Sequence, residues 1–204
     1  MSRYRGPRLR VTRRLGDLPG LTTKTSNKLN SPGQHGASSS KKFSQYALQL
    51  REKQKLRYNY GVTERQLLNY VKKSRKGKGS SGVLLLTLLE MRADNIVFRL
   101  GLAPTIPSAR QLITHGHILI NGKASSSPSY LCQKNDVISV QNSDVSKNLA
   151  KNFIETYGNS LTVPSHLSFN RDLLEGKIND LVNRNSISLV INELLVVEYY
   201  SRKV

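Results

Sequence analysis

The stretch "SARQLITHGHILINGK", residues 108–123, decides the fold. Its first half places apolar residues at helical spacing, and the helix is expected to end at Gly116, which tolerates the left-handed backbone that follows a helix. Its second half alternates and stops at Asn121 and Gly122, a pair that favours a type I′ hairpin turn. The stretch therefore predicts a helix running into the first strand of a hairpin. The apolar positions of this helix are Ala109, Leu112 and Ile113.

The residues on either side of this stretch extend the pattern. Asp94 is expected to cap a helix that ends at Gly101, before the quoted stretch begins. Thr105 or Ser108 is expected to cap the helix inside the stretch. The alternating segment 136–140 is the expected pairing strand. Residues 89–140 thus predict helix, helix, strand, loop and strand, a small α+β unit.

Two further helices are predicted upstream. Ser44 can cap the first, and Gly61 ends it. Thr63 with Gln66 three residues later forms a capping box, which marks the start of the second. The residues expected to face inward are Ala47, Leu50 and Tyr58 in the first helix and Leu67, Leu68 and Val71 in the second.

The two ends of the chain differ in character. Residues 1–41 are rich in Gly, Pro and basic side chains and lack a sustained apolar period, so we expect an extended basic arm that a partner orders. Residues 186–204 are apolar and β-branched, and their pattern fits either a strand or a buried helix. In both cases this segment is expected to pack on the core.

The charge is strongly asymmetric along the chain. The 204 residues carry 32 Lys and Arg against 13 acidic residues, a net charge of +19. Residues 1–80 hold 20 of these basic residues and three acidic ones, a net charge of +17, whereas residues 81–204 carry +2. A solvated surface usually mixes both signs. The first two-fifths of the chain therefore predicts contact with a nucleic acid.

The candidate nucleic-acid contacts fall into four groups. The predicted arm contributes Arg3, Arg5, Arg8, Arg10, Arg13 and Arg14. The first helix contributes Arg51, Lys53, Lys55 and Arg57, and the basic loop after the second contributes Lys72, Lys73, Arg75, Lys76 and Lys78. The small unit contributes Arg92, Arg99, Arg110, His115, His117 and Lys123. If both of its helices bury their apolar stripes, these last side chains are expected to lie outside together as an RNA face.

Other functional classes find little support in the sequence. His115 and His117 lack nearby carboxylate or cysteine partners in a metal-ligand motif, and no pattern of a nucleophile, a paired carboxylate or a Walker loop is present. The single cysteine, Cys132, excludes an internal disulfide. No apolar run approaches the roughly 18 residues that span a bilayer. We therefore expect no catalytic residues, no metal, no cofactor, no small-molecule substrate and no membrane.

Several segments together resemble one known family. "RADNIVFRLG…SARQLITHGHILINGK…PSY…NDVISV" is similar to the RNA-binding module named after ribosomal protein S-four. "RYRGPRLRVTRRLGDLPGLT", "SPGQHG", "SQYALQLREKQKLRYNYGVTERQL" and "INELLVVEYYSR" resemble the S-four family of small-subunit ribosomal proteins itself, over essentially the whole chain. The arm and the ending resemble the plastid-encoded members.

The resemblance implies an organisation and a task. It implies a mostly helical α+β protein with a basic extended arm (1–41), a helical rRNA-binding domain completed by the C-terminus (42–88 with 151–204) and an inserted helix-helix-strand module (89–150). Such proteins bind 16S rRNA early, at a junction in its 5′ domain, and nucleate assembly of the subunit body. They influence decoding accuracy together with small-subunit proteins S-five and S-twelve and line the mRNA entry channel. The plastid type implies the chloroplast stroma.

The resemblance also implies roles for residues within the module. Two other functions, an RNA-acting enzyme and general DNA binding, are the alternatives to the ribosomal one. The arginines and histidines of the module would contact rRNA, while Asp94, Gly116, Asn121 and Gly122 would set its backbone shape. Pseudouridine synthases and tyrosyl-tRNA synthetases contain the same module, but an enzyme of that kind needs a separate catalytic domain of roughly 150 residues. General DNA binding rests on charge alone, and discrimination of the 2′-hydroxyl would separate it from RNA binding.

Overall fold

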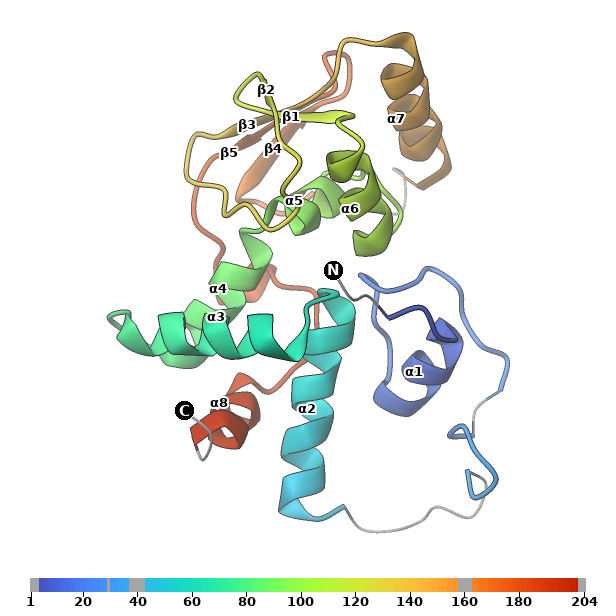
Figure 1. Cartoon of the computed structure of the whole chain (residues 1–204), viewed down its shortest axis with the longest axis vertical. Helices are drawn as coiled ribbons and strands as arrows, with labels where there is room; N and C mark the ends of the chain where they lie inside the picture. Colours follow the sequence, from blue (N-terminus) through green and yellow to red (C-terminus); the bar gives the residue numbers. More distant parts are fainter. Residues whose placement is uncertain (1–3, 29, 37–42, 158–162, 202–204) are drawn as a thin grey trace. The chain divides into compact units, whose positions relative to one another are not determined.

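The computed structural model describes residues 4–28, 30–36, 43–157 and 163–201. The chain forms two compact units: unit 1 comprises residues 1–86 and 189–204, and unit 2 comprises residues 87–188. The boundary falls within helix α4 (Ser81–Glu90). Unit 1 is helical, and unit 2 combines helices with a five-stranded antiparallel sheet. The predicted α+β class is confirmed (Figure 1).

The N-terminal segment contains a helix that the sequence did not predict. Helix α1 (Arg8–Leu15) buries Val11 and Leu15 on one side, and Leu18 and Leu21 are buried just beyond it. Because the apolar residues lie four apart between arginines, the helical period is short and easily missed. The prediction of an extended arm is therefore wrong for α1. Residues 1–3, 29 and 37–41 of that predicted arm lie outside the described residues.

The capping predictions for the next two helices are confirmed. Helix α2 (Gln45–Asn59) begins after Ser44, whose Oγ accepts from the Ala47 N–H at 3.3 Å. Helix α3 (Glu64–Lys76) begins with the Thr63–Gln66 capping box, in which each side chain accepts from the other residue's backbone N–H.

The buried face of α2 differs from the prediction. The fully or nearly buried residues are Lys53, Leu56 and Asn59, whereas Ala47, Leu50 and Tyr58 are half-buried. The Asn59 side chain accepts from the Gly20 N–H at 3.0 Å and so ties the N-terminal segment to the end of α2. In α3, Leu67 and Val71 are buried as predicted, and Leu68 is half-buried.

The apolar C-terminal segment forms a helix, which settles the ambiguity of its sequence. Helix α8 (Glu193–Ser201) packs against α2, and Figure 1 shows the two helices side by side. It buries Val196 and Tyr200 completely. The return of the chain's end thus completes the core of unit 1.

Unit 2 begins with the predicted helix-helix-strand pattern. Helix α5 (Ala93–Arg99) is followed by α6 (Ile106–Thr114), which Thr105 caps by accepting from the Ser108 N–H at 3.4 Å. Strand β1 (Ile118–Ile120) then forms a hairpin with β2 (Lys123–Ala124). One detail of the prediction is wrong: Arg92, not Asp94, is the N-cap of α5, and it makes no side-chain capping bond there.

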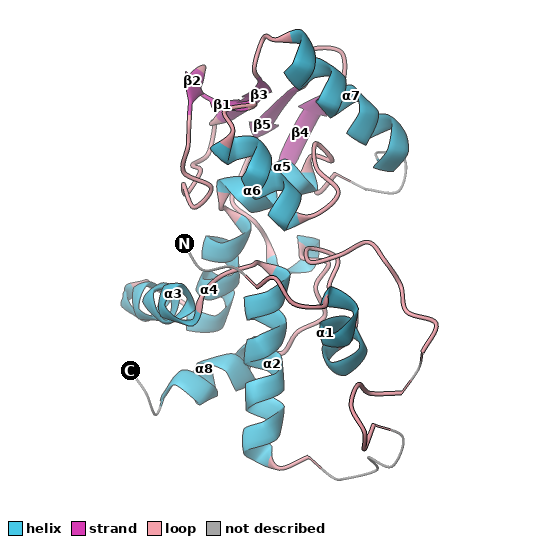
Figure 2. Ribbon diagram, turned by 45° about the vertical axis from the view of Figure 1, so that its right-hand side comes forward, coloured by secondary structure: helices cyan, strands magenta, loops and turns pink. Residues whose placement is uncertain are grey.

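The sheet of unit 2 extends further than the sequence indicated. Its order is β2-β1-β3-β5-β4, with β3 (Val137–Val140), β4 (Leu167–Asn170) and β5 (Glu175–Ile178) joined by antiparallel pairing. Helix α7 (Asp144–Tyr157) packs against β3 (Figure 2). The structure thus places most of 151–204, as far as Ser188, in unit 2 and not in the helical domain.

A glycine explains how β5 joins this sheet. A Cβ at Gly176 would overlap with Leu100 Cδ1, so the missing side chain lets the end of α5 pack directly on β5. The remaining regular element is a short 3₁₀ turn, η1 (Arg184–Ser186).

Candidate nucleic-acid interface

Helix α1 presents arginines to solvent because its apolar residues face the core. Among its cations, Arg13 is only half-buried, and its Nε and Nη2 donate to the Asn30 carbonyl at 3.0 and 2.6 Å. Arg8 is exposed and reaches the Leu21 carbonyl at 3.4 Å. The exposed arginines of this segment are Arg5, Arg8, Arg10 and Arg14, and Arg3 lies outside the described residues.

Lys53 does not lie at the surface, contrary to the prediction. Its Nζ contacts Glu64 Oε2 at 2.7 Å, and its side chain is only 6% exposed. Tyr200 donates to the other oxygen of Glu64, also at 2.7 Å. Lys53 therefore joins α2, α3 and α8 within unit 1 and is not positioned to bind a phosphate.

Ionisation at this junction follows from burial and hydrogen bonding. Burial alone would raise the pKa of Glu64, but hydrogen bonds from Lys53 and Tyr200 outweigh it and hold that pKa below its ordinary value. Burial raises the pKa of the Tyr200 phenol, and its bond to the Glu64 carboxylate raises it further. Tyr200 thus stays a neutral donor and Glu64 a charged acceptor.

The other basic residues of α2 are half-buried. The Arg51 guanidinium lies 5.6 Å from the Phe43 ring centroid, and Arg57 lies 5.4 Å from that of Tyr58. Lys55 contacts a carboxylate of its own helix, Glu52, at 2.7 Å. These stems pack along aromatic and aliphatic surface while their charged ends keep partial access to solvent.

The end of α3 and the loop after it form an exposed basic segment of unit 1. Ser74 and Val71 face the core, and the Ser74 hydroxyl donates to the Val71 carbonyl at 2.9 Å. Arg75 is half-buried. The exposed cations of this segment, called the basic loop below, are Lys72, Lys73, Lys76 and Lys78. The prediction of a loop is wrong for Lys72, Lys73 and Lys76, which lie on the last turns of α3, and Lys78 follows the helix.

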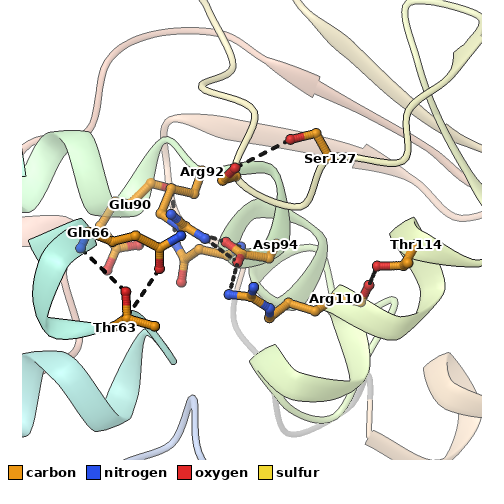
Figure 3. Close-up of polar contacts among 10 residues, drawn as sticks. Thr63, Gln66, Glu90, Arg92, Asp94, Arg110, Thr114 and Ser127 are labelled. Carbon is orange, nitrogen blue, oxygen red and sulfur yellow. Dashed lines mark hydrogen bonds and ion pairs between the residues drawn. The ribbon is translucent and has the colours of Figure 1, made fainter. Parts of the chain in front are cut away.

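In unit 2 the structure contradicts the predicted outward face of arginines. Arg92 is fully buried, and its Nε and Nη2 donate to Asp94 Oδ1 and Oδ2 at 3.0 and 2.7 Å. Arg110 is 5% exposed and reaches the same carboxylate at 3.3 Å (Figure 3). One carboxylate thus receives two guanidinium groups inside the protein, and these arginines point inward because Asp94 is there.

Arg99 follows the same principle with a different acid. It contacts Glu90 at 2.8 Å through Nη2 and at 3.2 Å through Nε, and Glu90 is 1% exposed. Arg99 also reaches the Ser188 hydroxyl at 2.6 Å, which fixes the end of unit 2 to α5. Asn95 donates to the Glu90 carbonyl at 2.9 Å and completes this buried network.

The histidines at the helix-to-strand junction have separate environments. His115 is exposed, whereas His117 is half-buried and its Nδ1 lies 2.9 Å from the Ser146 hydroxyl at the start of α7. Their ring centroids are 6.2 Å apart. Among the residues that the structure describes, no three His, Cys, Asp or Glu side chains gather as metal ligands.

The hairpin turn takes the shape that its sequence predicts. Asn121 and Gly122 both have positive φ, 51° and 74°, and Gly116 has a φ of 78° at the end of α6. The Asn121 side chain donates to Asp136 at 2.9 Å and accepts from the Val137 N–H at 2.9 Å. Lys123, just after the turn, is exposed.

An exposed cation and two buried acids were not predicted from the sequence. Arg65 on the first turn of α3 is exposed, but it lies between Thr63 and Gln66 and was considered only as part of the capping box. Glu90 and Asp94 lie within an otherwise apolar segment that also holds Arg92 and Arg99. Opposite charges inside an apolar segment are the signal that could have predicted internal pairing.

Comparison with known proteins decides the family. Residues 3–90 match the ribosomal protein S4/S9 N-terminal domain, and residues 91–138 match the S4 domain. Small ribosomal subunit protein uS4c of Euglena gracilis is 60% identical over 206 residues, and uS4 of Trichodesmium erythraeum is 59% identical over 203, each covering all of both chains. The uS4c of Oltmannsiellopsis viridis is 57% identical over 99% of this chain and all of its own.

The chain belongs to the uS4 family of small ribosomal subunit proteins. As a uS4 protein it is a component of the ribosome and not an enzyme. Similar uS4 relatives occur both in the uS4c group and in cyanobacteria. No helix in the described part of this uS4 chain is long and apolar enough to cross a membrane.

Proposed function

We propose that this chain binds 16S rRNA early in assembly of the small subunit, at a junction in the 5′ domain, and nucleates the subunit body. Membership of the uS4 family supports this proposal, because the relatives are small-subunit proteins over their full lengths. The charge distribution supports it independently. Unit 1 holds 22 Lys and Arg against five acidic residues, a net charge of +17.

The observation that carries the proposal is the exposure of this charge. Arg8, Arg10 and Arg14 of α1 and the lysines of the basic loop face solvent, and the apolar sides of their helices are buried. When exposed cations neutralise phosphates, the counterions condensed on the nucleic acid are released. This release drives binding and makes it depend on salt. Unit 1 thus supplies most of the affinity.

Unit 2 supplies shape in this proposal. It holds ten Lys and Arg against eight acidic residues, and Arg92, Arg99 and Arg110 are paired internally. Its exposed candidates for rRNA contact are His115 and Lys123. A rigid module with few phosphate contacts positions itself by fit to a folded RNA surface.

The test compares three ligands of equal length for the purified full chain: a transcript of the 16S rRNA 5′ domain, an unrelated RNA and duplex DNA. Each is titrated from low to high salt. We expect the preference for the 5′ domain to persist at salt that abolishes binding of the others. Parallel decay of all three curves would leave only non-specific electrostatic binding and refute the proposal.

We also propose a contribution to translational accuracy, together with proteins S-five and S-twelve, beside the mRNA entry channel and in the chloroplast stroma. A misreading reporter in ribosomes reconstituted with basic-loop variants tests the contribution to translational accuracy. An unchanged error rate in fully assembled ribosomes would contradict it. Recovery of the chain from purified chloroplasts tests the location, and its absence from them would contradict it.

A further inference from the structure

A small cavity lies beside the hairpin of unit 2. It has a volume of about 300 Å³ and is lined by Ile120, Asn121, Lys123, Ala124, Ser125 and Tyr130. Ligand pockets usually range from about 300 to 1,000 Å³, so this one suits a single small planar group. Its lining contains one aromatic ring, one cation and two hydrogen-bonding side chains, and no carboxylate.

Tyr130 is presented on a rigid segment. The Tyr130 carbonyl accepts from the Ala93 N–H at 2.9 Å, and the Pro128 carbonyl accepts from the Asp94 N–H at 3.2 Å. The Cys132 N–H donates to the Met91 carbonyl at 2.9 Å. The backbone on both sides of Tyr130 is therefore fixed to the start of α5, while its side chain remains 40% exposed.

The hairpin turn, which also lines the cavity, is held in place as well. The Asn121 side chain bonds to Asp136 and to the Val137 backbone, so the turn holds one shape. Strand β2 is the last strand of the sheet on this side, so its outer edge presents backbone N–H and C=O groups (Figure 2). Lys123 on this strand is exposed.

We infer that this cavity binds one unpaired nucleotide of the rRNA, with its base stacked on Tyr130 and its phosphate near Lys123. Sequence-specific RNA recognition relies on unstacked bases that lie on aromatic side chains and form hydrogen bonds through their edges. The cavity provides the ring, the polar edge and the cation in one place. Arg92, Arg99 and Arg110 are paired inside unit 2, so the predicted outward face of arginines does not carry this recognition. The inference rests on the proposed rRNA binding and adds a base-recognition site to it.

The experiment measures binding of the full chain to the 5′-domain transcript and to the unrelated RNA, with base-specific chemical probing of the complex. Tyr130→Leu should weaken binding to the 5′ domain by about tenfold or more, because stacking on an aromatic ring is removed. Binding to the unrelated RNA and the salt slope should stay unchanged. One unpaired base that wild-type protein protects should become reactive.

Two variants serve as matched controls. Tyr130→Phe keeps the ring and should retain both affinity and protection. Lys123→Gln should lower the salt slope by about one, whereas Lys134→Gln should leave it unchanged, because Lys134 lies in the same unit but does not line the cavity. Urea unfolding confirms that each variant folds.

The outcomes separate this inference from the proposed function. If the wild-type chain shows no preference for the 5′ domain, both are refuted. If the preference exists and Tyr130→Leu retains it with the same protected bases, the nucleotide site is refuted and the proposed function stands. If Tyr130→Leu impairs assembly of subunits with rRNA binding intact, the cavity serves a protein neighbour, and the inference is overturned.

Discussion

Asp94 provides the sharpest test of how unit 2 is held together. Its two carboxylate oxygens accept from Arg92 at 3.0 and 2.7 Å, from Arg110 at 3.3 Å and from the Asn95 N–H at 2.9 Å. Asp94→Ala removes all four bonds and leaves two buried guanidinium groups without this counter-charge. Removing one partner of a buried ion pair costs roughly 3–5 kcal/mol. Total stabilities are only about 5–15 kcal/mol, so the loss is a large fraction of the whole.

The assay is urea unfolding at 25 °C, followed by circular dichroism, with the matched variant Asp180→Ala. Asp180 pairs with Lys134 at 3.3 Å in the same unit, but both side chains are more than half exposed, so its removal should have no measurable effect. A further variant that replaces Asp94, Arg92 and Arg110 with Leu, Met and Met should recover much of the stability, because well-packed apolar groups can replace buried ion pairs.

Two results would refute this reasoning. Equal stability of Asp94→Ala and Asp180→Ala would show that the cluster contributes nothing to folding. Recovery of stability in the triple variant with complete loss of specific rRNA binding would show that the arginines contact RNA themselves, as their sequence pattern first suggested.

Further predictions concern the rest of the chain. Tyr200→Phe should destabilise unit 1 by roughly 0.5–1.5 kcal/mol in urea unfolding, because its bond to Glu64 is removed. Because folding lowers the pKa of Glu64, its contribution to stability is present above the ordinary pKa of 4.5 and disappears as pH falls through the folded value; Glu64→Gln should flatten that acid dependence, and an unchanged pH profile would contradict the argument. Replacing the basic-loop lysines by glutamine should lower the salt slope of RNA binding by about one for each phosphate that they neutralise, and an unchanged slope would mean that the loop touches no phosphate. Burial raises the pKa of the Cys132 thiol to about 12, so the folded chain should resist a thiol reagent at neutral pH that modifies the unfolded chain at once; equal rates would contradict its burial.

Local chemistry made much of this fold predictable. The Ser44 cap, the Thr63–Gln66 capping box and the Asn121-Gly122 turn depend on neighbouring residues alone, and each has the predicted geometry. What failed depends on distant partners. The pairing of β5 with β3 joins segments far apart in sequence, and there Gly176 lies against the equally distant Leu100. The predicted inward positions of α2 were wrong because polar Lys53 and Asn59 are buried by partners distant in sequence, Glu64 and Tyr199 for Lys53 and Gly20 for Asn59.

For the candidate nucleic-acid interface, too, contacts with distant residues limited what the sequence could predict. The charge asymmetry predicted contact with a nucleic acid, which agrees with membership of a ribosomal protein family. Most of the cations predicted in residues 1–41 and at the end of α3 are exposed where the structure describes them, although Arg13 and Arg75 are half-buried. The basic residue type alone does not tell which cations face inward. Lys53, Arg99 and Arg110 meet carboxylates nine or more residues away in sequence, which the fold brings into contact. The Arg92–Asp94 pair is local, and its opposite charges within an apolar segment were the available signal.

Given the proposed rRNA binding, these internal pairs assign different roles to the two units. Arg92 is buried and paired with Asp94, so it is not available to bind a phosphate. The pair instead stabilises the start of α5, whose backbone is hydrogen-bonded to the segment that carries Tyr130. A module built this way loses little entropy on binding because its recognition surface is already rigid. Under the function proposed above, unit 1 supplies the strong, salt-dependent attraction and unit 2 the selection among RNA surfaces. Substitutions in the Arg92–Asp94–Arg110 cluster should therefore impair specific binding through loss of stability, whereas substitutions in the basic loop should weaken binding to all RNAs alike without affecting folding.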